Sequence, residues 1–210
     1  GTRGEPGNDS EHFNQPNDVI TAPDGSIFVA DGHGGQSMLT PNNPTVTEGA
    51  TGRIMKFSAN GTFIKEWGQI GTEIGNFRTP HALEMDSEGR LFVADRGNHR
   101  IQLFDQDGNY LDSYVQFSRV SGLFITDDDM LYAIDSETNP NNHPGWSTGI
   151  RIGHASEDRV TAFIPPYEID SRDTGVAGEG IAVDADGNVY AAEGPISRPT
   201  AGGGLTKYVR

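Results

Sequence analysis

The chain has 210 residues, a formal net charge of −15 at pH 7 and no cysteine. The absence of Cys excludes disulfides and thiolate metal sites, and the negative charge opposes binding to nucleic-acid phosphates and anionic lipid. No segment approaches the ~18 apolar residues of a membrane-spanning helix, so we expect no nucleic-acid partner and no membrane span.

A block of sequence occurs twice. Residues 12–31 reappear as residues 76–95, which is a shift of 64, whereas residues 52–57 reappear as 99–104, which is a shift of 47. The repeating unit is therefore about 47 residues long, with a 17-residue insertion after Asp31 in the first copy. Self-similarity at this period indicates stacked supersecondary units, because one such unit cannot bury its apolar face alone.

Each unit predicts the same order of short strands, and two fainter copies follow the first two. Turn pairs such as Asp24-Gly25 and Glu88-Gly89 separate the strands, as tight hairpins require. Four antiparallel strands per unit predict the blades of an all-β propeller. In chain order the predicted strands are Asp18–Thr21, a strand ending at Asp31, Arg53–Phe57 and Phe63–Trp67; His81–Asp86, Leu91–Asp95, Arg100–Phe104 and Tyr110–Val115; Gly122–Thr126, Leu131–Asp135, Gly149–Gly153 and Val160–Ile164; and Ile181–Asp184, Val189–Glu193 and Leu205–Val209.

We expect one propeller domain over residues 1–210, made of four consecutive blades. The approximate blade limits are 12–68, 69–116, 117–166 and 167–210, and the last blade has three strands. Because no terminal strand completes another blade, we interpret the chain as an open wedge of an incomplete ring that lacks its N-terminal blades. Uncovered blade faces and strand edges predict self-association of the isolated chain.

Several segments resemble a known family. Asn98–Asp105 and the Phe-Val-Ala-Asp segments look like NHL repeats. The match is closer to the peptidyl-α-hydroxyglycine α-amidating lyase family, and to its bacterial branch, in His12–Val19, Glu66–Gly68, Pro80–Leu83, Val93–Arg96, Asn142–Trp146 and Lys207–Arg210. The resemblance implies a six-bladed ring and a lyase that splits a peptidyl-hydroxyglycine into a peptide amide and glyoxylate, with a zinc ion and a structural calcium.

The resemblance also implies metal ligands. His81, in Pro80–Leu83, matches one zinc histidine, and the backbone carbonyl of Leu83 matches a calcium ligand. A second histidine would belong to the missing blades. Glu179 stands where the third is expected, and Gly180 stands where an acid normally follows it. Glu179 alternatively is a solvated loop carboxylate.

Two further residues carry implied catalytic roles. Arg96 matches the active-site arginine after Val-Ala-Asp, and His33 aligns with an active-site tyrosine. Structural alternatives exist: Arg96 could pair with Asp95 or Glu84 in a surface network, and His81 could hydrogen-bond the next blade.

We therefore expect a lyase-like metal-binding propeller that acts on a small peptide-like substrate, with weak or altered activity because the acid and the third histidine are replaced. The alternative is a non-catalytic NHL scaffold that presents its long insertions, residues 32–51, 136–148 and 194–204, to a peptide or protein. The compartment stays open, with an exported location (periplasmic or extracellular) slightly favoured.

Overall fold

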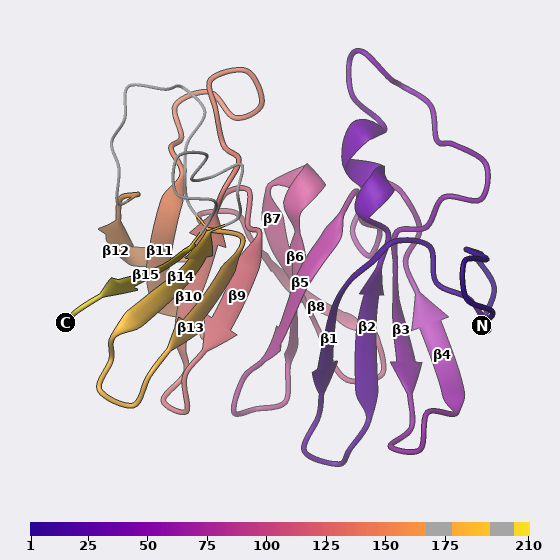
Figure 1. The fold of residues 1–210 in the computed structure, drawn as a ribbon, viewed down its shortest axis with the longest axis horizontal. Helices are drawn as coiled ribbons and strands as arrows, with labels where there is room; N and C mark the ends of the chain where they lie inside the picture. Colours follow the sequence, from indigo (N-terminus) through magenta and orange to yellow (C-terminus); the bar gives the residue numbers. More distant parts are fainter. Residues whose placement is uncertain (167–177, 194–203) are drawn as a thin grey trace.

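The structure, a computed structural model, describes residues 1–166, 178–193 and 204–210. Within these ranges the chain forms four antiparallel sheets that follow one another in chain order (Figure 1). This confirms the predicted all-β propeller of four consecutive blades, the last with three strands among the described residues. The predicted start of the last blade at residue 167 and most of the insertion at 194–204 lie outside the described residues.

The strands lie within one or two residues of the predicted limits. The first sheet contains β1 (Pro16–Thr21), β2 (Ile27–Asp31), β3 (Arg53–Phe57) and β4 (Phe63–Trp67). The second contains β5 (Pro80–Met85), β6 (Leu91–Asp95), β7 (Arg100–Phe104) and β8 (Tyr110–Tyr114). The third contains β9 (Gly122–Ile125), β10 (Met130–Asp135), β11 (Gly149–His154) and β12 (Val160–Ile164), and the fourth contains β13 (Gly180–Val183), β14 (Val189–Glu193) and β15 (Gly204–Tyr208).

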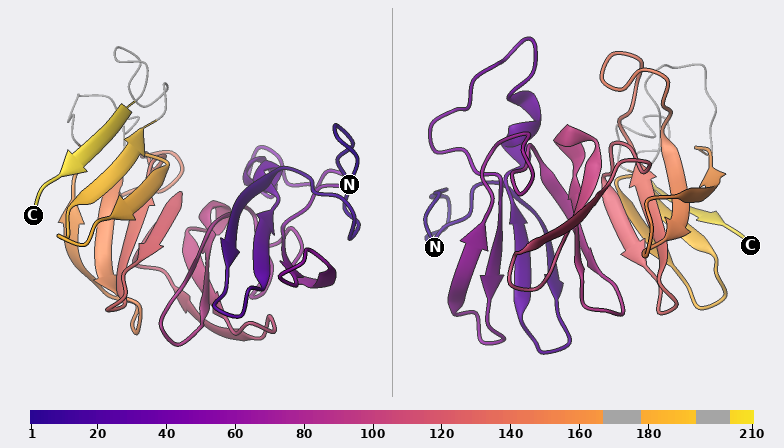
Figure 2. Two further views of the ribbon diagram at one scale, coloured as in Figure 1. Left: turned by 60° about the horizontal axis from the view of Figure 1, so that its bottom comes forward. Right: turned by 180° about the vertical axis from the view of Figure 1, so that it is seen from behind.

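The first strands of the four sheets lie side by side in the order β1, β5, β9 and β13. The sheets fan out from these strands along an arc, with the first and last sheets at its opposite ends (Figure 2). The count of six blades for a complete ring stays a prediction.

Alternation along the strands gives the second and third sheets two buried faces each. On β6, Leu91 and Val93 pack into a core shared with the first sheet, whereas Phe92 and Ala94 pack into a core shared with the third. A smaller core joins the third and fourth sheets. Since successive side chains of a strand point to opposite faces, one strand contributes to two interblade cores.

Two short 3-10 helices, which the sequence analysis did not predict, follow second strands: η1 (His33–Ser37) and η2 (Arg96–Asn98). No helix in the part of the chain that the structure describes is long and apolar enough to cross a membrane.

Candidate functional site

Loops at one end of the sheets bring together most of the predicted site residues. The second strands of the first three sheets end there, at Asp31, Asp95 and Asp135, and η1 and η2 follow the first two (Figure 1). Glu179 reaches the same end, because β13 begins where its hairpin partner β14 ends. Antiparallel hairpins of neighbouring blades thus direct distant segments of sequence to one place.

Arg96 lies in the middle of this cluster, with 1% of its surface exposed. Its Nη1 donates to Oε2 of Glu179 at 3.3 Å, and its Nη2 donates to Nε2 of His33 at 3.2 Å. The Glu137 carboxylate lies 3.8 Å from Nη1. Burial lowers the pKa of Arg96, and Glu137 and Glu179 oppose that shift. Because the pKa of Arg is ordinarily far above neutrality, the guanidinium stays charged.

His81 follows Pro80 at the start of β5, and its ring contacts the third blade. Its Nδ1–H donates to the backbone oxygen of Ser121 in the next blade at 2.6 Å, because a carbonyl oxygen can only accept. This bond fixes the tautomer and leaves the Nε2 lone pair 3.8 Å from Oε2 of Glu179. Burial, and then the charge of Arg96, lower the pKa of His81 to about 3, so the ring is neutral at pH 7. The interblade bond and an available ring nitrogen therefore coexist.

His33 is the first residue of η1, and its ring centroid lies 5.6 Å from that of His81. Since Arg96 has only donors, Nε2 of His33 accepts and the ring proton sits on Nδ1. Burial, and then the charge of Arg96, lower the pKa of His33. The nitrogen of His33 that faces the cluster is therefore already engaged.

Five further residues belong to the cluster and were not predicted: Gln36, Arg78, Arg119, Ser136 and Glu137. Arg119 is 8% exposed, and its Nη2 donates to Oε2 of Glu137 at 2.7 Å and to Oε1 of Gln36 at 3.3 Å. Ser136 donates to Oε1 of Glu179 at 3.0 Å. Burial acts to raise the pKa of Glu137, but the two guanidinium groups beside it outweigh burial and hold it below its usual value. Gln36, Ser136 and Glu137 lie in the insertions at 32–51 and 136–148, whose residues the repeat does not predict.

The resemblance implies a zinc ion, which requires enough suitable ligands in this cluster. A catalytic zinc site usually has three protein ligands. Among the described residues, no group of three or more His, Cys, Asp or Glu side chains is placed to hold a metal. His81 and Glu179 offer two suitable donors, whereas the nitrogen of His33 accepts from the positively charged Arg96. The described donor set therefore does not complete a zinc site.

The remaining predicted residues lie beside the cluster. Leu83 is two residues beyond His81 on β5, with its side chain in a core and its backbone N–H donating to Oδ2 of Asp18 at 2.8 Å. Its role toward calcium stays a prediction. The alternative pairing of Arg96 with Asp95 on the surface is wrong, because Arg96 is buried and Asp95 accepts from Arg100 instead.

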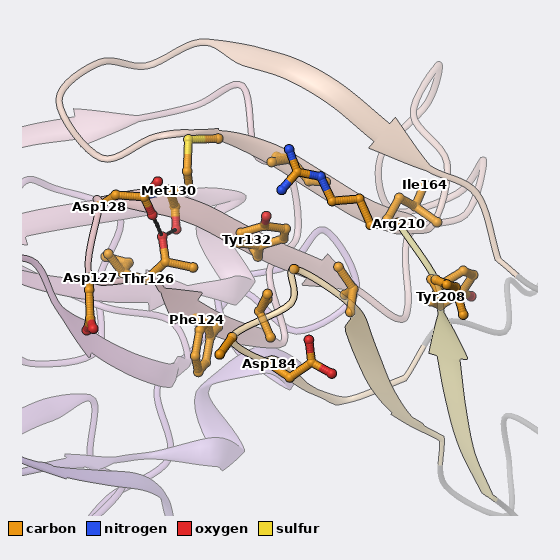
Figure 3. Close-up of a pocket in the computed structure, with 17 residues that line it drawn as sticks. Phe124, Thr126, Asp127, Asp128, Met130, Tyr132, Ile164, Asp184, Tyr208 and Arg210 are labelled. Carbon is orange, nitrogen blue, oxygen red and sulfur yellow. Dashed lines mark hydrogen bonds between the residues drawn. The ribbon is translucent and has the colours of Figure 1, made fainter.

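A separate hollow of about 850 Å³ opens between the third and fourth sheets (Figure 3). Its walls include Phe124, Tyr132 and Tyr208, together with the turns at 126–128 and 184–187. Those turns join first to second strands, so they lie at the end of the sheets away from Arg96. None of the predicted site residues lines this hollow.

Comparison with known proteins gives matches of two kinds. The NHL repeat family pattern matches residues 77–104. Peptidyl-glycine alpha-amidating monooxygenase B of Xenopus laevis is 34% identical over 202 residues, which is 90% of this chain and 20% of that protein. A probable peptidyl-alpha-hydroxyglycine alpha-amidating lyase of Caenorhabditis elegans is 34% identical over 102 residues, covering 47% of this chain and 25% of that protein.

The similarity to solved structures concerns the fold alone. The hydrazine synthase of Kuenenia stuttgartiensis superposes with a TM-score of 0.62 at 13% identity, covering 99% of this chain and 49% of that one. The chain spans about a fifth of the length of the Xenopus amidating enzymes. Taken with the repeat, the strand pattern and the family match, these similarities show that the chain is an NHL-repeat β-propeller homologous, over most of its length, to the peptidylglycine alpha-amidating monooxygenase and lyase proteins.

Proposed function

We propose that the cluster around Arg96 is a substrate site of the amidating-lyase kind, which binds the carboxylate of a small peptide-like molecule. The observation that carries the proposal is the almost complete burial of Arg96 among groups from several blades, at the place where the active-site arginine of the resembling family is expected. A guanidinium group matches a carboxylate geometrically, because it offers parallel N–H donors.

The charge balance of the cluster supports an anionic ligand. Three guanidinium groups, those of Arg78, Arg96 and Arg119, donate to Gln36. Two carboxylates, those of Glu179 and Glu137, accept from Arg96 and Arg119. One positive charge is left, inside a protein whose formal net charge is −15. A single carboxylate would neutralise it, whereas a neutral ligand would not.

Proton acceptors lie next to this binding group. The neutral His81 presents its Nε2 lone pair, and Glu179 presents a carboxylate 3.8 Å away. Either can accept a hydroxyl proton from a hydroxyglycine. Glu179 is already held by Arg96 and Ser136, and Gly180 offers no side chain where the family has an acid. We therefore expect glyoxylate release to be weak or absent.

The zinc and calcium expected from the resemblance enter no step here, because the described donors do not complete a zinc site. His81 and Glu179 are the pair that we propose for any bound metal. The metal content of the purified protein beside His81→Ala tests this pair, and equal metal content in the two proteins would remove His81 from it.

The substrate proposal is tested by calorimetry with N-acetylglycine and its neutral counterpart N-acetylglycinamide, and by glyoxylate release from an N-acylated hydroxyglycine. We expect binding of the acid over the amide, and at least a tenfold loss of acid binding in Arg96→Met, since a charge-assisted bond contributes about 1.5–3 kcal/mol. Equal binding of acid and amide would overturn the proposal.

A peptide scaffold is the second candidate, and one surface favours it. Trp146 and Phe163 are 37% and 43% exposed and flank the guanidinium of Arg151, at 5.0 and 5.3 Å from the ring centroids. Exposed aromatic rings beside an arginine are frequent in peptide-binding surfaces. A scaffold predicts peptide binding that depends on Trp146 and is unchanged in Arg96→Met.

A further inference from the structure

The side chain of Gln36, on η1, lies between the two most buried arginines of the site. Its Oε1 accepts from Nη2 of Arg96 at 2.6 Å and from Nη2 of Arg119 at 3.3 Å. Its backbone oxygen accepts from Nη2 of Arg78 at 3.4 Å. A neutral residue thus supplies the oxygens on which three cations converge, although charged donors bond more strongly to carboxylates.

The same arginines have unused hydrogen-bonding capacity. The Nε–H groups of Arg78, Arg96 and Arg119 are buried and have no partner among the described residues. A buried donor without a partner destabilises the folded protein, and more so when the donor is charged. A carboxylate can accept from Nε and Nη of one guanidinium in two parallel bonds, one to each of its oxygens, whereas an amide has only one oxygen to offer.

The placement of Gln36 follows from how η1 docks. Gly35 precedes it, and a Cβ at Gly35 would stand 1.8 Å from the backbone oxygen of Arg78. Only glycine permits this approach between the first and second blades. The backbone of η1 is therefore fixed against the second blade, whereas the side chain of Gln36 can rotate away without moving it.

We propose that Arg119 and Arg96 together form the carboxylate-binding pair, and that the side-chain amide of Gln36 occupies the carboxylate position until a substrate displaces it. This inference rests on the proposed function, that the site binds a carboxylate. It adds a basis for selecting carboxylates over amides, because a ligand must form stronger hydrogen bonds to the two guanidinium groups than the side-chain amide of Gln36 does. An amidated peptide offers the same group as Gln36 and gains nothing, whereas a carboxylate gains charge-assisted bonds.

The test measures calorimetric binding of N-acetylglycine to the full chain in four variants. Gln36→Ala removes the competitor, so we expect about three- to tenfold tighter binding, the equivalent of one hydrogen bond. Gln36→Glu supplies an internal carboxylate, so binding weakens at least tenfold. Arg119→Gln weakens binding at least tenfold. Arg159→Ala, at an exposed arginine paired with Glu157, is the control and binds like the natural protein.

The outcomes separate the two proposals. Selective binding of the acid that is lost in Arg96→Met but unchanged in Arg119→Gln, Gln36→Ala and Gln36→Glu overturns this inference and leaves the proposed function standing. Absence of selective binding in the natural protein overturns both. If Arg119→Gln fails to fold, which its thermal melt reports, the opposite effects of the two Gln36 substitutions still decide the inference.

Discussion

Arg100 and Arg96 lie four residues apart on one blade and have opposite surroundings. Arg100 donates through Nε to the buried carboxylate of Asp95 at 2.9 Å, and through Nη2 to the backbone oxygens of Glu73 and Asn76. Every bond of Arg100 is to a carboxylate or a carbonyl of its own blade. Arg96 bonds across blades, to Glu179, a histidine and an amide, and its Nε has no partner among the described residues.

The repeat explains the first arginine and not the second. Arg53 pairs with Asp31, and Arg151 pairs with Asp135, as Arg100 pairs with Asp95. The same arginine–aspartate pair therefore recurs in three blades. The residue after each aspartate is free to differ: it is Gly32, Arg96 or Ser136. Repeated residues thus hold each blade together. The position directly after the aspartate, which is Arg96 in the second blade, differs from blade to blade.

Of the substitutions that this comparison suggests, we expect Asp95→Ala to lower the free energy of unfolding most. The carboxylate accepts from Arg100, Asn98 and Gln102 and from the backbone N–H of Arg78. Its removal leaves Arg100, whose side chain is only 13% exposed, without its counter-charge, which costs about 3–5 kcal/mol of unfolding free energy. Urea denaturation monitored by tryptophan fluorescence measures this loss.

The matched substitution in the site is Arg96→Met, which keeps an unbranched apolar chain in place of the methylene groups and removes the guanidinium. Its partner Glu179 is 47% exposed at the side chain and can be hydrated, and the unpartnered Nε disappears. We expect a change in unfolding free energy within about 1 kcal/mol, together with loss of carboxylate binding. A loss in Arg96→Met as large as that in Asp95→Ala would mean that both arginines are structural.

The same distinction explains what could be predicted from the sequence. The strands, turns and blade order follow from the repeat, because period-2 alternation and Asp-Gly turns are local signals. Arg96 and His81 were found through family motifs, since each adjoins a repeated strand. Gln36 and Glu137 lie in insertions, and only the packing of blades brings them to the site.

Arg119 carried a signal that was missed. Its backbone N–H donates to Asp135 as that of Arg78 donates to Asp95 and that of Asn14 donates to Asp31. These residues therefore occupy one repeat position, shortly before the first strand of each blade and next to the aspartate of the arginine–aspartate pair. Aligning the blades on that aspartate, rather than on the strands alone, places two arginines at the site.

A smaller effect is expected from the contact between the second and third blades. The rings of His99 and His143 stack with centroids 4.2 Å apart. Burial, and then His143, lower the pKa of His99 to about 4. The unfolded chain takes up this proton near pH 6.5 and the folded chain only near pH 4, so stability is lost as the pH falls between these values. We expect about 1–2 kcal/mol, allowing for partial exposure.

Comparison with His99→Asn isolates this contribution, because Asn tolerates the left-handed backbone that His99 adopts at φ 57°. Urea unfolding of both proteins at pH 7 and pH 4.5 gives the difference. The low pKa of His81 acts in the same direction in both proteins and cancels. Equal pH dependence in the two proteins would show that the stack does not couple protonation to folding.

The smallest effect on stability is expected in the turns at the end of the sheets away from Arg96. There the repeat conserves a backbone conformation rather than a charged residue. Gly25, Gly89 and Gly187 all have positive φ in the first-to-second-strand turn, and Asp129 takes that position in the third blade with φ 59°. Asp129 compensates by accepting from the backbone N–H and hydroxyl of Ser87 in the second blade.

Substitution of Asp129 by Gly or by Ala removes both bonds equally, but only Gly relieves the backbone strain. Asp129→Gly should therefore be more stable than Asp129→Ala by about 1 kcal/mol, measured by urea denaturation at pH 7. Equal stability of the two would mean that the turn changes conformation once its bonds to Ser87 are lost, so that the left-handed residue is imposed by the contact between blades and not by the repeat.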